Sequence, residues 1–308
     1  RRVLFRSMQS FKIPHFGLAR QYKNLKDELL DATDQALRSG CLIGGHFTRE
    51  FENWLASKTK TSYALTVHSG TQALAIIARA KLLNYLYHNK ATPKIRIPNL
   101  TYPATLNAFI ESGREVELAD TDRYGVVLPT RRSPNLFHCV VGLYGRKPWA
   151  TDIMVNKYDY DIIVDGAQHW LVADGNVGYG MAISFDPTKN LPASGNGGAI
   201  VTNDKALYEF AMEYRNNGYN ALFSQHTISG TNSKMSEQDC AHMLVRAKYI
   251  DEWQRRREQI AEYYRERCKD LPVIVLNDGT ESHANQKFVL YSEYRNLIHG
   301  GKIGRAHV

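Results

Sequence analysis

The stretch SYALTVHSGTQALAIIARAKLL, residues 62–83, holds a complete strand, turn and helix. It begins with SYALTV, an apolar run of the length of a short β-strand, and the polar HSG ends that run. Apolar residues then recur at the spacing of one helix face, at Leu74, Ile77, Ala78 and Leu82. The stretch therefore predicts a strand that turns directly into a helix, which is the repeating unit of an α/β fold.

The same alternation continues along the chain. Further strands are expected at KIRIPN, EVELAD, LFHCVVGLYG, DIIVDGA, AISF and GGAIVTN. A helix through PATLNAFIESG should stop at Gly113. Alternating strands and helices are typical of a parallel sheet covered by helices, so the sequence predicts the α/β class.

The last third of the chain predicts one long helix and the start of a smaller unit. Ser236 and Asp239 begin the helix with a pattern like a capping box. Its apolar stripe consists of Met243, Ala247, Ile250, Trp253, Ile260 and Tyr264. After Pro272, VIVLN and QKFVLY are the expected strands of a second, smaller domain.

Both ends of the chain are expected to be sequencing-adapter read-through. RRVLFRS can be back-translated into DNA whose reverse complement, in another frame, encodes the terminal IGRAHV. We therefore set residues 1–7 and 302–308 aside, and expect a natural start at Met8 and a natural frame that is cut near Gly301. The formal charge of +8 then loses five cations and becomes +3, so the charge balance does not indicate a nucleic-acid or membrane partner.

The apolar runs and the cysteines of the sequence bear on the cellular location of the protein and on metal binding. No apolar run approaches the roughly 20 residues of a membrane span, and the residues after Met8 lack the apolar core of a signal peptide. The cysteines, which show no paired metal-ligand spacing, are Cys41, Cys139, Cys240 and Cys268. We expect free thiols in a reducing cytoplasm and no metal site.

Ser69, Gly70 and Thr71 lie where the first helix begins. Free backbone N–H groups and the positive end of the helix dipole meet there, and glycine lets an anion approach closely. Thr71 can add a hydroxyl. On this motif alone, a simple N-cap by Ser69 explains the pattern better than an anion site does.

Other residues follow strands at the same edge of the expected sheet. Asp165 ends the strand IIVD, where open α/β sheets hold ligands, and a carboxylate there needs a partner such as a protonated ring nitrogen. Gln168 could donate to a phenolate-like oxygen, Tyr102 could stack on a flat heterocycle, and Ser184 could face a phosphate. Each residue also has a plainer explanation. Asp165 could cap the following helix and Gln168 could have no specific polar role. Tyr102 could belong to the core and the Ser184 hydroxyl could face solvent.

Lys189 lies a few residues after the strand AISF, near Pro187. Most lysines in such turns are solvated, but a lysine held at a ligand site can form a Schiff base. Together with Lys189, these residues supply an anion cradle, a carboxylate for a ring nitrogen, an aromatic ring and an amine. That set predicts a pyridoxal-phosphate enzyme, because this cofactor is an electron sink that needs orientation and a tuned ring nitrogen.

An ordered series of motifs is similar to that of the DegT/DnrJ/EryC1/StrS aminotransferases, which act on nucleotide-linked sugars. The resemblance covers nearly all of residues 12–300, through FGLARQYKNLKDELLDATDQALRSGCLIGG, HSGTQAL, NLTYPATLNAFIESG, VVGLYGRKP, IIVDGAQ, SFDPTKNLPASGNGGAIVT and GTNSKMSEQDCAHMLVRAKYIDEWQRRR. It implies the type I fold of pyridoxal-phosphate-dependent transferases, with a large domain over residues 8–250 built on a mostly parallel seven-stranded sheet. It also implies a small α+β domain that begins at 251–301 and is cut short.

The resemblance also implies a role for each candidate. Lys189 would form the internal aldimine with pyridoxal 5'-phosphate and then move a proton, and Asp165 would keep the pyridine nitrogen protonated. Gln168 would reach the ring oxygen, and Tyr102 would stack on the ring. The residues that would surround the phosphate are Ser69, Gly70, Thr71, Ser184 and, from the second subunit of a homodimer, Asn232.

The activity implied is transfer of an amino group, expected from L-glutamate, to a keto-sugar nucleotide. The sequence departs from the family at Asn196, where relatives often carry Glu, at Lys234, where Arg is common, and at His169, where a small residue is typical. Two other functions stay open, a sugar-nucleotide dehydratase and a non-catalytic regulatory homologue. Some related dehydratases carry His at the lysine position, so Lys189 favours transamination.

Overall fold

The computed structural model describes residues 17–88, 93–127, 136–148, 162–279 and 282–294. The segments expected to come from an adapter, residues 1–7 and 302–308, and the expected start at Met8 lie outside these ranges. So does the end of the expected small domain, residues 295–301.

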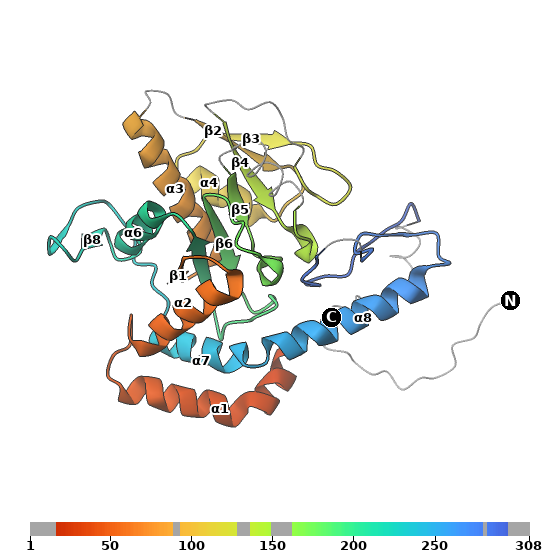
Figure 1. Cartoon of the computed structure of the whole chain (residues 1–308), viewed down its shortest axis with the longest axis horizontal. Coiled ribbons are helices and arrows are strands. Elements are labelled where there is room, and N and C mark those ends of the chain that lie inside the picture. The colour runs from red at the N-terminus through yellow and green to blue at the C-terminus, as the bar shows by residue number, and fades with distance from the viewer. Residues whose placement is uncertain (1–16, 89–92, 128–135, 149–161, 280–281, 295–308) are drawn as a thin grey trace.

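A seven-stranded sheet forms the centre of the fold (Figure 1). Its spatial order is β1-β7-β6-β5-β4-β2-β3, and every pair from β6 to β3 is parallel, whereas β7 runs antiparallel to both of its neighbours. The strands are β1 (Tyr63–Val67), β2 (Lys94–Pro98), β3 (Val116–Ala119), β4 (Leu136–Val141), β5 (Ile162–Asp165), β6 (Gly180–Ser184) and β7 (Gly198–Thr202). This arrangement confirms the α/β class and the mostly parallel seven-stranded sheet.

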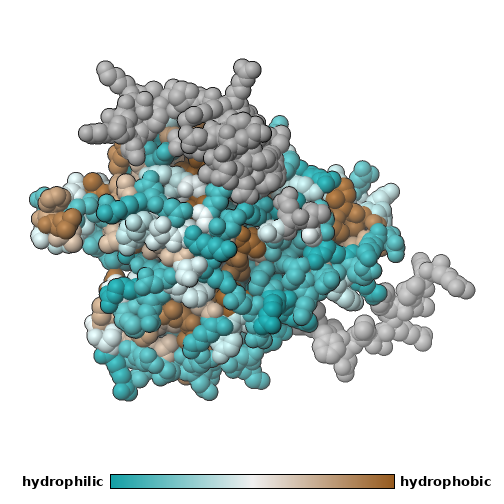
Figure 2. Space-filling view, in the orientation of Figure 1, coloured by the Kyte–Doolittle hydropathy of each residue, from teal (hydrophilic) through white to brown (hydrophobic). Residues whose placement is uncertain are grey.

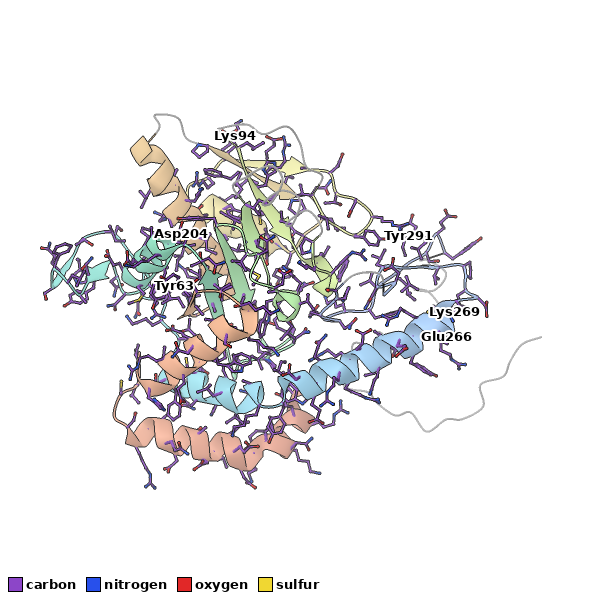
Figure 3. All side chains as sticks on the ribbon, viewed as in Figure 1. Tyr63, Lys94, Asp204, Glu266, Lys269 and Tyr291 are labelled. Atoms are coloured by element: carbon purple, nitrogen blue, oxygen red, sulfur yellow. The ribbon has the colours of Figure 1, made fainter. Side chains whose placement is uncertain are left out.

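Helices α3 (Gly70–His88), α4 (Pro103–Glu111) and α6 (Lys205–Tyr214) cover one face of the sheet. The first half of α3 is apolar on nearly every side and almost wholly buried, as befits a helix held between a sheet and other helices. Asp204 caps α6, because its Oδ1 accepts a hydrogen bond of 2.9 Å from Leu207 N (Figure 3). As expected, α4 ends just before Gly113, whose φ of +79° is one that glycine adopts without strain.

Helices α2 (His46–Thr59) and α7 (Glu237–Ala247) cover the opposite face. Phe51 and Leu55 of α2 pack there with Met243 of α7 and with Trp170, which begins the short 3-10 helix η2 (Trp170–Val172). Helix α1 (Leu18–Arg38) lies outside α7, and a separate apolar cluster joins the two helices (Figure 1).

The N-terminus of α2 is capped by a residue from far along the chain. Glu237, with 1% of its surface exposed, accepts hydrogen bonds from the backbone N–H groups of Gly45, Phe47 and Thr48 and from the Thr48 hydroxyl. Helix α2 has no N-cap side chain of its own, so Glu237 supplies the missing acceptors together with a negative charge at the positive end of the dipole.

The single long helix expected after Ser236 is wrong: the structure has two helices. Ser236 caps α7 as predicted, since its Oγ accepts from Asp239 N at 3.0 Å. The chain then bends at Lys248 and Tyr249, and α8 (Ile250–Cys268) begins. Tyr249 and Trp253 pack against α1 at the bend, so the apolar spacing continues through it. The spacing alone therefore does not reveal the bend.

The expected strands after α8 are shorter than predicted. Only β10 (Ile274–Val275) and β11 (Leu290–Tyr291) pair, antiparallel to each other. Between them, residues 282–287 run along the turn after β4, where the 3-10 helix η1 (Leu143–Gly145) lies. Backbone hydrogen bonds join Lys287 N to Tyr144 O and Ala284 N to Gly145 O, which brings this late segment to the edge of the sheet.

Among the described residues, no helix combines the length and the apolar character needed to cross a membrane.

Candidate active site

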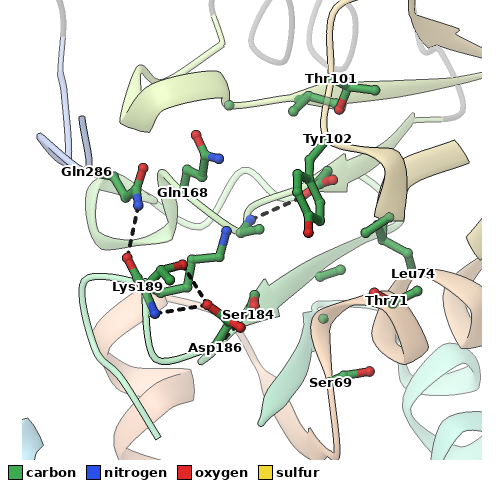
Figure 4. Close-up of a pocket in the computed structure, with 18 of the residues that line it drawn as sticks. Ser69, Thr71, Leu74, Thr101, Tyr102, Gln168, Ser184, Asp186, Lys189 and Gln286 are labelled. Atoms are coloured by element: carbon green, nitrogen blue, oxygen red, sulfur yellow. Dashed lines mark hydrogen bonds between the residues drawn. The ribbon is translucent and has the colours of Figure 1, made fainter. Parts of the chain in front are cut away.

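A cavity of about 430 Å³ opens at the carboxyl edge of the parallel strands. The turns that follow β1, β2, β4, β5 and β6 all line it (Figure 4). Parallel neighbours end at the same edge, and the register places Asp165 of β5 beside Val141 of β4 and Ala182 of β6. The cavity is within the usual size range for small-molecule sites.

The turn between β1 and α3 forms one wall of the cavity. Ser69 Oγ accepts a hydrogen bond from Gln72 N at 3.2 Å, so the N-cap expected of Ser69 is present. A Cβ added to Gly70 would lie 2.8 Å from Ser184 Cβ, and one added to Gly198 would lie 2.3 Å from the Ser69 carbonyl carbon. Two glycines therefore bring α3, β6 and β7 close together, and Gly70 and Thr71, in the first turn of α3 where N–H groups have no partner within the helix, line the cavity.

Asp165 ends β5 with 6% of its surface exposed. Its Oδ2 accepts a hydrogen bond of 2.8 Å from Thr105 Oγ1, and its Oδ1 accepts one of 3.1 Å from Ala167 N. Burial raises the pKa of Asp165, and the Thr105 hydroxyl, the Ala167 amide and the Lys189 charge oppose that rise. These groups partly stabilise the ionised carboxylate inside the protein, and a cationic partner in the cavity would stabilise it further.

Lys189 lies on the turn after β6, and its backbone N–H donates to Asp186 O at 2.8 Å. Its side chain extends into the cavity from the side opposite Thr71 and Ser69 (Figure 4). Burial lowers the pKa of the Lys189 amine, and Asp165 and Asp186 oppose the shift. A lower pKa makes the neutral, nucleophilic amine more accessible.

Three further candidates also line the cavity. Tyr102, 67% exposed, precedes α4, and its ring stands over the space between Lys189 and α3 (Figure 4). The Gln168 amide oxygen accepts a hydrogen bond from Tyr144 N, which leaves its NH₂ group as a donor. Ser184 Oγ accepts from Asp186 N at 3.3 Å and lies beside Gly70.

Asn232 is the one candidate that does not line this cavity. It is exposed, and its backbone pairs with that of Asn216 in an isolated bridge. The other candidates from the sequence, Ser69, Gly70, Thr71, Tyr102, Asp165, Gln168, Ser184 and Lys189, all lie on the cavity wall.

Sequence reasoning missed several residues of the site. Thr105 contacts Asp165 directly, and its place in the first turn of α4 could have suggested this role. Gln286, which donates from Nε2 to Thr188 O at 3.1 Å, and the exposed Lys287 reach the cavity from residues 282–287. No local pattern marks these two, since only the pairing with the turn after β4 brings them there.

The three departures from the family pattern have different positions. Asn196 lines the cavity. Lys234 donates from Nζ to Asn216 Oδ1 at 2.6 Å, outside the cavity wall. His169 is buried, and burial lowers its pKa to about 3, so the ring is neutral and belongs to the packing around Gly142.

The residues present fit pyridoxal phosphate. The glycine-bounded N-terminus of α3 suits the phosphate, the buried Asp165 carboxylate suits a protonated ring nitrogen, and the Lys189 amine suits the aldehyde carbon. Fold and site together define the class, an α/β enzyme of the type I pyridoxal-phosphate-dependent transferase fold.

The chain belongs to the DegT/DnrJ/EryC1/StrS aminotransferase family, whose sequence profile matches residues 23–130 and 156–300. It is 30% identical to the dTDP-3-amino-3,6-dideoxy-alpha-D-galactopyranose transaminase of Aneurinibacillus thermoaerophilus, over 89% of this chain and 77% of that protein. It is 29% identical to the erythromycin biosynthesis sensory transduction protein EryC1 of Saccharopolyspora erythraea, over 93% of this chain and 80% of that protein.

Among solved structures, the chain resembles S. venezuelae DesV in complex with a ketimine intermediate. The TM-score is 0.83 and the identity 26%, over 93% of this chain and 80% of DesV. The family, the fold, the class of enzyme and the cofactor expected from the sequence are thereby confirmed: the protein is a pyridoxal-phosphate-dependent transaminase.

Proposed function

We propose that this transaminase moves an amino group from L-glutamate to the ketone of a nucleotide-linked sugar. The observation that carries the proposal is the meeting of Lys189, Asp165 and the α3 N-terminus in one cavity. The choice of acceptor is supported by a 30% identical relative named as a dTDP-sugar transaminase. The donor follows from the family resemblance of the sequence.

Each residue contributes a distinct step. Pyridoxal phosphate, when bound, supplies an electron sink for the bond changes at the amino-bearing carbon. Lys189 Nζ would bind the cofactor at its aldehyde carbon, and the free amine would carry a proton as a general acid and base. Asp165 would accept a hydrogen bond from the ring nitrogen and keep the proton there, and Gln168 would donate from its amide to the ring oxygen.

The first test is a spectral titration of the purified chain. With pyridoxal phosphate added, we expect a visible absorption band that L-glutamate discharges, and we expect Lys189→Ala to lose both responses. A keto-sugar nucleotide should then gain nitrogen, which mass spectrometry detects. Loss of water from the sugar instead would favour a dehydratase. A band that no amino donor discharges would favour a regulatory protein, a role that the name of EryC1 suggests for that relative.

We also propose that the enzyme is a homodimer with shared sites. Asn232 is exposed and does not line the cavity of its own chain, as expected of a residue that serves a partner. Close to it in sequence, the hairpin of β8 (Tyr219–Asn220) and β9 (Gln225–His226) projects beyond α6 (Figure 1). Its tip exposes Leu222 by 91% and Phe223 by 66%, which gives an apolar patch suited to association (Figure 2).

Co-expression of two inactive variants tests the shared site. A heterodimer of Lys189→Ala and Asn232→Ala has one site with both residues intact if Asn232 serves the partner, so amino exchange should exceed that of either variant alone. If Asn232 acts within its own chain, every site in the mixture lacks one group and no recovery appears.

We place the enzyme in the cytoplasm. All four cysteines are free thiols in the structure, and two of them are buried, which suits a reducing compartment. Fractionation of cells that produce the protein would test the location.

A further inference from the structure

Two threonine side chains connect the edge of the cavity to the Asp165 carboxylate. Thr105, in the first turn of α4, is fully buried, and its Oγ1 lies 2.8 Å from Asp165 Oδ2. Thr101, in the preceding turn, lines the cavity, and its Oγ1 lies 2.8 Å from Thr105 Oγ1. The three side chains therefore form one line of hydrogen bonds from the cavity wall to the end of β5.

The direction of these hydrogen bonds follows from the groups themselves. An ionised carboxylate only accepts, so the Thr105 hydroxyl must donate its single proton to Asp165. The Thr105 oxygen is then free to accept, and Thr101 must be the donor to it. Both hydroxyl dipoles thus point toward Asp165, and each hydrogen bond polarises the next.

This arrangement also fixes the plane of the carboxylate. Thr105 holds Oδ2 and the backbone N–H of Ala167 holds Oδ1, so Asp165 cannot rotate about its last bond without losing one of them. Each carboxylate oxygen keeps a lone pair for a further donor, and Asp165 lines the cavity. Helix α4 adds the positive end of its dipole, since Thr105 lies in its first turn.

We propose that Thr105 is a positioning residue for the cofactor, which holds the Asp165 carboxylate ionised and aimed at the ring nitrogen, and that Thr101 orients Thr105 for this task. The proposal rests on the role given above to Asp165. The charge that acts on Asp165 from a neighbouring element is that of Lys189, in the turn after β6. The Cys139 thiol of β4 is also near, and burial and the Asp165 charge raise its pKa, so it stays neutral. Neither group can replace the short hydrogen bond from Thr105.

The test compares Thr105→Val, which keeps the shape and removes the hydroxyl, with Thr105→Ser, which keeps the hydroxyl. Cofactor affinity comes from titration of the cofactor-free protein with pyridoxal phosphate. We expect Thr105→Val to weaken binding about tenfold or more, since a lost hydrogen bond to a charged group has this size, and Thr105→Ser to restore it. Thr101→Val should give a smaller loss in the same direction.

A second measurement separates positioning from a purely structural role. Without the Thr105 hydroxyl, the protonated form of Asp165 persists to higher pH, so the acidic limb of the absorption profile of the bound cofactor should move to higher pH. A structural role alone would lower the melting temperature of the cofactor-free protein and leave this profile in place. Parental affinity together with a parental profile in Thr105→Val would overturn the proposal.

Asp165→Asn is the reference that separates this proposal from the proposed function. If Asp165→Asn binds the cofactor as the parent does, the role of Asp165 fails, and the inference about Thr105 fails with it. If Asp165→Asn loses affinity and Thr105→Val does not, only the inference about Thr105 is wrong.

Discussion

Asp165 and Lys189 carry opposite charges at one cavity, and burial disfavours the charged form of each side chain. It raises the pKa of the Asp165 carboxyl and lowers the pKa of the Lys189 amine, while each charge favours the other. A cofactor that brought a protonated ring nitrogen to Asp165 and a covalent partner to Lys189, as proposed, would relieve both groups. We therefore expect these two groups to lower the free energy of unfolding of the cofactor-free protein, and cofactor binding to restore it.

Replacing Asp165 by Asn tests this at the level of one side chain. The pKa of Asp165 is higher in the folded than in the unfolded chain, so the folded protein loses stability as the pH rises through the interval between the two values. Above that interval the cost is present in full. Asp165→Asn should thus raise the free energy of unfolding of the cofactor-free protein at pH 7, and the gain should shrink as the pH falls toward 3.8.

The same variant should bind pyridoxal phosphate about 10- to 100-fold more weakly, because a hydrogen bond to a charged group is lost. Urea unfolding at several pH values and a cofactor titration measure the two effects. A variant that is both less stable at pH 7 and unchanged in affinity would contradict this view of Asp165.

At the scale of elements, the site depends on how closely β7 approaches the start of α3. A Cβ on Gly198 would meet the Ser69 carbonyl carbon at 2.3 Å and Gly70 N at 2.5 Å, and both belong to backbone that cannot yield easily. The N–H groups proposed to hold the phosphate are those that such a shift would displace.

Gly198→Ala should therefore lower both the melting temperature and the affinity for pyridoxal phosphate, with an expected loss of about 1–3 kcal/mol of stability from overpacking. Gly195→Ala is the matched control, since a Cβ there meets nothing within 4 Å. Thermal unfolding and cofactor titration of both variants decide the matter. Equal melting temperatures and affinities of the two variants would show that the approach of β7 does not shape the proposed phosphate site at the start of α3.

The cap that Glu237 supplies joins two elements that are distant in the sequence. Glu237→Gln keeps the size of the side chain but removes its charge and turns an NH₂ group toward N–H donors of α2. We expect a loss of roughly 2–4 kcal/mol in the free energy of unfolding, measured in urea. The exposed Glu262 on α8 is the control, where the same substitution should change little.

At the scale of the whole molecule, segments from both ends of the described chain complete the structure around the sheet. Helix α1 packs on α7, and residues 282–287 bring Gln286 and Lys287 to the cavity. The boundary expected at residue 250 between a large and a small domain stays a prediction. The bend at Tyr249 falls beside it, and α8 carries the chain away from the sheet toward the late segment (Figure 1).

Association should depend on the tip of the β8–β9 hairpin. The double variant Leu222→Asp and Phe223→Asp is expected to raise the dissociation constant of the dimer at least tenfold, because burial of one such side chain is worth about 1.5–3 kcal/mol. Sedimentation over a range of concentrations measures it, with Leu271→Asp, also at an exposed position, as the control. If the double variant sediments as the parent does, the interface lies elsewhere.

Much of this protein follows from its sequence. The alternation of apolar runs and helical patterns is enough for the α/β class, because period and length are local properties. The order of the motifs is enough to indicate the family. Eight of the nine candidate residues line one cavity in their own chain, since each ends or follows a strand whose carboxyl end lies at the same edge of the sheet. The expected role of Asn232 needs a second chain, and co-expression would test it.

Only the tertiary structure decided the rest. The bend between α7 and α8 arises where Tyr249 and Trp253 meet α1, the cap of α2 comes from Glu237, and Gln286 reaches the cavity by pairing with the turn after β4. Each of these depends on contacts between residues that are far apart in the chain, and no pattern of neighbouring residues encodes such a contact. The sequence by itself therefore determined the seven strands of the sheet and the chemical groups of the site, whereas packing determined where the late helices divide and which distant groups support the site.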